Sequence, residues 1–312
     1  MKLNLSSVLS FVLFAPFLLA SCRAVKENKS LETSENSYST YYSNVAKADS
    51  LFAVKRYSEA YNIFNETFNK YKPLNTFNFR EYTRYVISKH LSGNDVSKKE
   101  VERLISEYGG ASSMYMHRDS TLKHLLKKHK ISKREIDSLN DSYVKSLDTV
   151  LRKQLFKAIE EDQYYRTYYE GKDKDKLWKK SDSINEKLLV DLFEKNIFPN
   201  ETIIGPKFYK GSVVDIDVLL LHTKDSIRMN YFLPKMKKFI FEGKCEPHIY
   251  AIMVDQYHLY NDREQLYGTY NTKELSPKKY SYYNENRRKL RIGLPTIEFD
   301  IFWQDYLINL WN

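Results

Sequence analysis

Cysteine, glycine and proline are all scarce in this chain of 312 residues, which contains two cysteines, nine glycines and eight prolines. Glycine and proline break helices and form tight turns, so their scarcity argues against a turn-rich all-β fold. Long segments rich in Lys, Glu, Leu and Tyr point the same way. The sequence therefore predicts a mainly α protein.

Motifs of known activity are also missing. The chain has neither a Gly-x-Ser-x-Gly elbow nor a His-Glu-x-x-His helix, and it lacks a glycine-rich phosphate loop. Its net charge of +10 favours contact with anionic headgroups, but the basic residues are spread along predicted helices. Because no stripe combines aromatic and basic residues, we expect no nucleic-acid partner. We also expect no cofactor.

A lipoprotein signal opens the chain. Lys2 precedes the apolar residues 8–19, and the sequence Leu-Ala-Ser-Cys ends at Cys22. A short positive end, a short apolar stretch and small residues before a cysteine are typical of such a leader. We expect residues 1–21 to be removed and Cys22 to carry palmitate or a similar lipid, which attaches the protein to a membrane. The alternative is an ordinary secretory peptide with an incidental cysteine.

This signal predicts that the protein is located in the bacterial cell envelope. Arg23 follows the cysteine in place of the aspartate that can retain lipoproteins at an inner membrane, which favours the outer membrane. Once Cys22 is acylated, only Cys245 remains, so no internal disulfide can form and stability must come from packing.

The mature chain divides into a tether and two helical regions. Residues 22–39 are polar and without periodicity, which predicts a flexible tether. Helical periodicity covers 40–146, where Ala48, Ala60 and Phe64 occur at the spacing of a tetratricopeptide repeat. A generic helical hairpin is the alternative. Such helices can present a groove to a protein partner. Farther along, Ser132 to Glu135 has the pattern of a capping box that opens a helix.

Polar residues interrupt the apolar stripes of the second helical region, 147–312. Asp162 and Arg166 continue a stripe that begins at Leu147, and His222 occupies a position where a leucine is expected. Burying an unpaired charge costs several kcal/mol, so such groups must be paired or face a wet pocket. The other polar residues at positions of this kind are Asp182, Asn185 and Asp255.

Six motifs in this region resemble a bacterial family of unknown function. They are Asp162-Gln163-x-x-Arg166, Asp182-x-x-Asn185, His222, Asp255-Gln256, Gln265-x-Tyr267-Gly268-Thr269 and Arg287-Arg288. The resemblance covers about 147–298 and implies a mostly helical domain, with no established reaction. The stretch near 264–270 is expected to be a short extended element. The chain departs from the family at Leu221 and Gln256, where the family has Gln and Arg, and this departure leaves catalysis in doubt.

Two functions from different classes fit these observations. In the first, the protein is a lipid-anchored binding or assembly module whose polar cluster is structural. The alternative is a hydrolase-type enzyme, with His222 and either Asp162 or Asp255 as the acid–base pair and Arg166 or Arg287 holding an anionic substrate. Whether the protein is an enzyme is left open. The other candidate binding residues are Gln163, Asp182, Asn185, Gln265, Tyr267 and Thr269. We expect no metal site, because one histidine and scattered carboxylates fit zinc poorly.

Overall fold

The structure is a computed structural model that describes residues 37–74, 81–112, 116, 118–209, 211–270 and 275–311. The predicted signal peptide, Cys22 and nearly all of the predicted tether lie outside these residues. Among the described residues, no helix is both long enough and apolar enough to cross a membrane.

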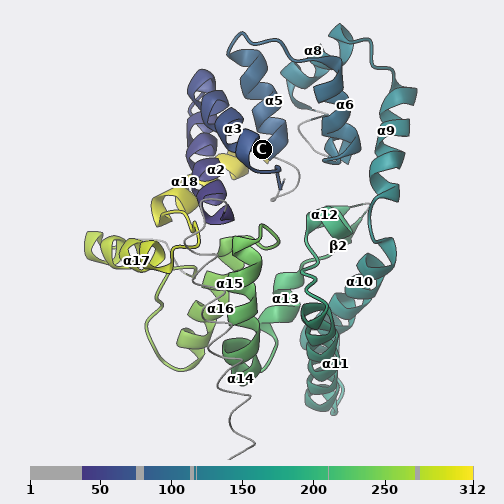
Figure 1. The fold of residues 1–312 in the computed structure, drawn as a ribbon. Coiled ribbons are helices and arrows are strands. Elements are labelled where there is room, and N and C mark those ends of the chain that lie inside the picture. The colour runs from purple at the N-terminus through teal and green to yellow at the C-terminus, as the bar shows by residue number, and fades with distance from the viewer. Residues whose placement is uncertain are drawn as a thin grey trace, which may run out of the picture.

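The predicted mainly α fold is confirmed (Figure 1). The first part of the chain forms α2 (Tyr38–Ala53), α3 (Tyr57–Lys70), α5 (Glu81–Leu91), α6 (Lys98–Ser106), α8 (Ser120–Lys128) and α9 (Lys133–Lys145), with a 3₁₀ turn, η2, at Gly110–Ser112. Ser132 caps α9 in a capping box with Glu135, as predicted.

The second part of the chain is also helical and contains a small hairpin of two strands. Strands β1 (Phe208–Tyr209) and β2 (Ser212–Val213) pair antiparallel, with Phe208 opposite Val213. The helices are α10 (Thr149–Gln163), α11 (Lys174–Glu194), α12 (Glu201–Ile204), α13 (Ile216–Leu221), α14 (Asp225–Ile227), α15 (Leu233–Phe241), α16 (Pro247–Tyr260), α17 (Pro277–Leu290) and α18 (Ile297–Trp311). Two π-helical turns are η3 (Tyr164–Tyr168) and η4 (Arg228–Phe232).

Helices α2 and α3 form the predicted hairpin because small side chains line their crossing. Ala48 and Ala60 are both fully buried, which lets the two backbones approach closely, and Phe64 fills the space beside them. A pair of helices at this place is thus confirmed, while its assignment as a tetratricopeptide repeat stays a prediction.

The end of the chain returns to its beginning. Helix α18 lies beside α2, and α15 also contacts α2 (Figure 1). Arg84 of α5 joins these helices, because its guanidinium pairs with Asp49 of α2 at 2.6 Å and lies 4.9 Å from the ring centre of Trp303 in α18. One hydrophobic core extends from Tyr41 to Ile292 and so includes residues on both sides of position 146. The domain boundary at 146 stays a prediction.

The expected extended element near 264–270 is an irregular loop without strand pairing. Its backbone N–H groups donate to a side chain of α16 instead of to a neighbouring strand. The described strand pair is the hairpin at 208–213.

Candidate functional site

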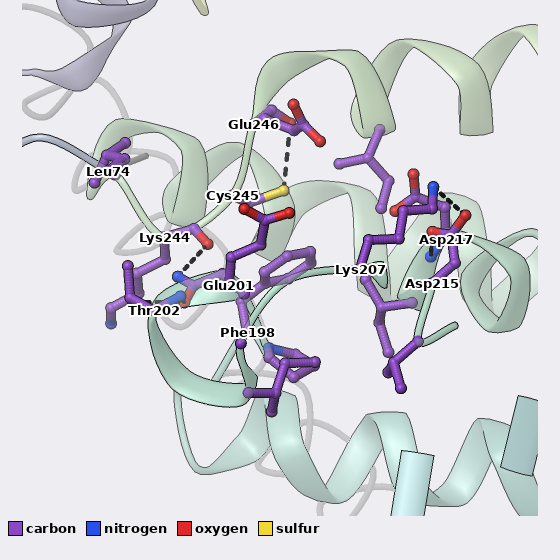
Figure 2. A pocket seen from close by; sticks show the side chains of 18 of the residues that line it. Leu74, Phe198, Glu201, Thr202, Lys207, Asp215, Asp217, Lys244, Cys245 and Glu246 are labelled. Carbon is purple, nitrogen blue, oxygen red and sulfur yellow. Dashed lines mark hydrogen bonds and ion pairs between the residues drawn. The ribbon is translucent and has the colours of Figure 1, made fainter. Parts of the chain in front are cut away.

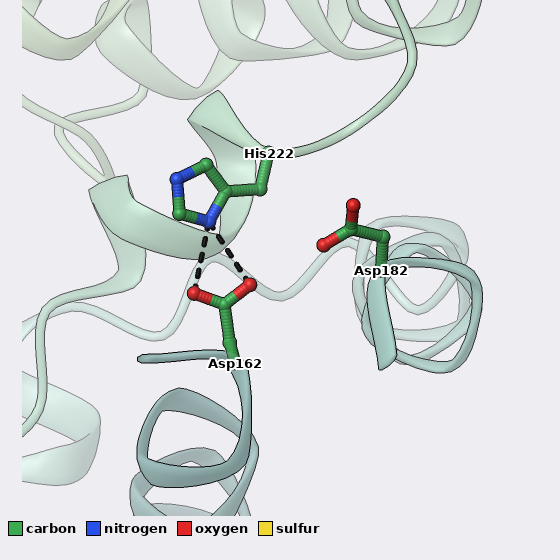
Figure 3. Close-up of side chains that lie close together, drawn as sticks. All are labelled: Asp162, Asp182 and His222. Atoms are coloured by element: carbon green, nitrogen blue, oxygen red, sulfur yellow. Dashed lines mark hydrogen bonds and ion pairs between the residues drawn. The ribbon is translucent and has the colours of Figure 1, made fainter. Parts of the chain in front are cut away.

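Five of the predicted site residues come together where the C-terminal ends of α10 and α13 meet the middle of α11. Asp162 and Gln163 end α10, Arg166 lies in the π-helical turn η3 that follows, Asp182 comes from α11, and His222 caps the C-terminus of α13. Figure 3 shows three of them facing one another. We call these five residues the His222 centre. The π-helical turn matters because it changes the helical phase after Gln163, and such turns are frequent at functional sites.

Asp162 is the hub of the His222 centre. Its side chain is 1% exposed, and its two oxygens lie 3.0 and 2.9 Å from Nδ1 of His222. Gln163 donates to it at 2.7 Å, and Nε of Arg166 donates at 3.1 Å. Arg166 also donates to Asp182 at 2.5 Å and lies over the ring of Trp178. Each acidic group of the centre therefore has a partner of opposite charge.

The electrostatics follow from these contacts. Burial alone would raise the pKa of Asp162, but the hydrogen bond and charge of His222, with help from Gln163 and Arg166, outweigh burial and lower it. For Asp182 burial is the larger effect, and its pKa is raised despite the ion pair with Arg166. Asp162 is therefore ionised at neutral pH and holds the imidazole by Nδ1. Among the described residues, Nε2 of His222 has no hydrogen-bond partner.

A metal ion fits this centre poorly. Asp162, Asp182 and His222 place one ligand atom each within 4.8 Å of one another, which is close enough for a shared ion. However, the guanidinium of Arg166 already bridges the two carboxylates and supplies the positive charge that a metal would bring. Since Arg166 is committed to two aspartates, it also fits poorly the predicted role of clamp for an anionic substrate.

Asn185 is buried on α11 but does not join this group. Its side-chain amide donates to Ser181 at 3.4 Å, one turn earlier on the same helix.

A second group of predicted residues forms a hydrogen-bonded network around Asp255 of α16. This fully buried carboxylate accepts hydrogen bonds at 2.8 to 2.9 Å from the backbone N–H groups of Leu266, Tyr267 and Thr269 and from the Thr269 hydroxyl. Gln265 closes the loop by exchanging two hydrogen bonds with the backbone of Tyr270. With four donors on one carboxylate, Asp255 is better placed to hold the loop than to transfer protons.

Gly268 and Arg287 complete this hydrogen-bonded network. Gly268 has a φ of +63°, and a Cβ there would lie 2.7 Å from Tyr283 and Ile297, so glycine is required. Arg287 is 2% exposed and donates to the carbonyl groups of Tyr267 and Pro295 and to Asp300. The hypothesis that Arg287 holds an anionic substrate is therefore not supported by its position.

An arginine from another turn of the chain contacts Gln256, the residue that follows Asp255. Arg228 of η4, which the sequence reasoning missed, is buried and donates to the side chains of Gln256 and Asp225 and to the Leu221 carbonyl at 2.8 Å. It thus connects Leu221 and Gln256, the two positions at which the motifs differ from those of the family that they resemble. The unusual residues at positions 221 and 256 were the available signal in the sequence, but they did not indicate that residue 228 contacts both.

A separate cavity of about 100 Å³ contains a set of acidic groups that the sequence reasoning also missed (Figure 2). Its walls come from the loop through α12, from the start of α13 and from the turn between α15 and α16, and Tyr42 of α2 reaches it from the N-terminal helices. That turn is held by Tyr42, whose hydroxyl donates to the Cys245 carbonyl at 2.6 Å, and by Asn200, which donates to the Lys244 carbonyl at 2.9 Å. We call it the acidic cavity, because its carboxylates are Glu201, Asp215, Asp217 and Glu246.

Burial perturbs the acids of this cavity. Burial and the charge of nearby Asp215 raise the pKa of Asp217 to about 7. Burial, followed by the charge of Asp217, raises the pKa of Glu246 well above its usual range, and burial raises that of the Cys245 thiol. Asp215 forms an ion pair with Lys207, whose charge also opposes the rise in the pKa of Asp217 and Glu246 without outweighing burial. The sequence offered little signal here, since Asp215 and Glu246 occupy ordinary positions at the starts of helices.

Comparison of the chain with protein-family models, with curated proteins and with solved structures found no match. The resemblance to a bacterial family of unknown function therefore stays a prediction from the motifs.

Proposed function

We propose that this chain is a lipid-anchored binding protein of the bacterial cell envelope, most consistent with the outer membrane, and that its ligand occupies the acidic cavity. The observation that carries the binding role is the contrast between two kinds of polar group. The carboxylates of Asp162 and Asp255 each accept several hydrogen bonds, whereas Oε2 of Glu246 in the cavity is buried and accepts none from the described residues. Paired groups stabilise the fold, and unpaired buried groups are characteristic of binding sites.

Two parts of this proposal rest on the sequence alone. The anchor depends on the Leu-Ala-Ser-Cys motif at Cys22. The possible protein partner depends on the helical pattern of residues 40–146.

The binding role can be tested by blocking the cavity from its rim. Thr202 is an exposed residue of the cavity wall, so Thr202→Trp should fill the entrance with little cost to the fold. Val150→Trp, at a position 79% exposed on α10, is the matched control. A thermal-shift screen with small cationic, neutral and anionic compounds should give stabilising compounds for the wild type and for Val150→Trp but not for Thr202→Trp. Equal responses from all three proteins would contradict the proposal.

An acid–base enzyme is the second candidate, and the geometry of His222 favours it. A buried aspartate holds Nδ1, while Nε2 has no partner among the described residues, which is the arrangement of a general base. His222 is about a quarter exposed, so a substrate could reach it. The unfolding experiment with Asp162→Asn in the Discussion separates this candidate from a structural centre.

A further inference from the structure

The acidic cavity contains more negative than positive groups. Its two lysines are already paired, Lys207 with Asp215 and Lys244 with Glu242 outside the cavity. Oε2 of Glu246 is buried and receives no hydrogen bond from any described residue. Within the same part of the chain, no hydrogen bond reaches the Asp217 carboxylate, although its backbone N–H donates to Asp215. Asp217 and Glu246 thus have no ion-pair partner of their own among the described residues, and the charge of Lys207 offsets their burial only in part.

Glu246 is placed to respond to a bound charge. It precedes Pro247 at the start of α16, yet its side chain does not cap that helix. Figure 2 shows Glu246 on one side of the cavity and Asp217 on the other. The charge of Asp217 contributes to the raised pKa of Glu246, after burial, which is the larger cause. A positive charge between them would relieve both.

The form of the cavity favours an organic cation over a metal ion. Among the described residues, the group that brings three ligand atoms close enough for a metal is the one around His222, not the carboxylates of this cavity. The walls also contain apolar side chains, among them Phe198, Val214 and Ile249. A ligand with a short hydrocarbon part and an ammonium group matches both kinds of surface.

We infer that the acidic cavity binds an aliphatic ammonium ion, with the nitrogen between the carboxylates of Asp217 and Glu246 and the hydrocarbon against the apolar wall. This inference rests on the proposed binding function and names its ligand class. Burial disfavours the ionised form of both carboxylates, and an ammonium ion between them stabilises that form, so its affinity depends on Glu246 more than on the apolar contacts.

The test is calorimetric titration of the purified full-length protein with n-butylammonium chloride. Butan-1-ol serves as the neutral probe of similar shape, butyrate as the anion, and magnesium chloride as the metal. We expect saturable binding of butylammonium that weakens with added salt. Glu246→Gln keeps the shape of the side chain and should weaken binding by about tenfold or more. Asp217→Asn provides an independent variant, and Glu194→Gln, at an exposed site with partners Tyr231 and Lys235, should bind as the wild type does.

The outcomes separate the inference from the proposed function. Equal binding of butanol and butylammonium, or butylammonium binding that is unchanged in both Glu246→Gln and Asp217→Asn, would overturn the ammonium inference and leave a binding cavity. Binding of magnesium in preference to butylammonium would also overturn it. If no probe binds, the ammonium inference is wrong. The proposed binding function is then tested separately by the Thr202→Trp screen. Unfolding curves of both variants establish that each is folded before titration.

Discussion

Asp162→Asn is the substitution that best distinguishes a structural His222 centre from a catalytic one. Asparagine keeps the shape of the side chain but removes its charge and places an N–H₂ group among the donors His222, Gln163 and Arg166. Breaking a buried ion pair costs about 3 to 5 kcal/mol. Here Arg166 keeps Asp182 and is about a quarter exposed, so we expect a smaller loss of roughly 2 to 3 kcal/mol.

Urea or thermal unfolding measures this loss. A decrease of this size corresponds to a lowering of the melting temperature by roughly 4 to 10 °C for a chain of this length. Asp191→Asn, at an exposed position on α11, is the control and should change little. Unchanged or increased stability of Asp162→Asn, with the same result for His222→Ala, would refute the structural interpretation, because functional sites store unfavourable electrostatics. That result would favour the enzyme.

The pH dependence gives the same experiment a second readout. The pKa of Asp162 lies below its ordinary value of 3.8 in the folded protein, so its ionised form stabilises the fold. This stabilisation is complete above the unfolded pKa and is lost as pH falls through the folded value. The difference between wild type and Asp162→Asn should therefore be largest near neutral pH and should shrink below about pH 4. A difference that stays constant across this range would contradict the charge-based explanation.

Two further predictions concern the lipid anchor and the N-terminal helical hairpin. Cys22→Ser removes the sulfur that accepts lipid, so the protein should be lost from carbonate-washed membranes, and a variant that still fractionates with them would exclude the anchor. Ala60→Arg puts a long charged side chain into the fully buried crossing of α2 and α3. Because α2 contacts α15 and α18, limited proteolysis should show both halves losing protection together, whereas a resistant fragment of 147–312 would support the predicted boundary at 146.

Local patterns predicted the helices and one of the two polar groups well. The stripe from Leu147 to Ile159 leads to Asp162 and Arg166, and this interruption located the His222 centre, since a charge on a buried face needs partners. The capping box at Ser132 could also be predicted, because it is formed by residues within one stretch of four.

Three features could not be read from the sequence, and each depends on contacts between distant segments. The sequence does not show that the motif residues divide between two polar groups, one around Asp162 and one around Asp255, because periodicity gives the face of a helix and not the neighbour it meets. Arg228 donates to Gln256, where an arginine was expected, and the sequence alone does not reveal that these two residues meet. The acidic cavity forms only when the turn before α16 meets α12 and α13.

The same physical rule separates the three polar groups into different roles. Asp255 receives four hydrogen bonds from one loop and can only hold that loop. Asp162 is also paired, but one of its partners is His222, whose Nε2 has no hydrogen-bond partner among the described residues, so this pairing is compatible with a structural role or with proton transfer. Glu246 has a buried oxygen that accepts no hydrogen bond from the described residues, which is unfavourable for folding. A positively charged ligand would bind here because it stabilises the ionised carboxylate. For this reason the acidic cavity, and not the His222 centre, is the better place to search for a ligand first.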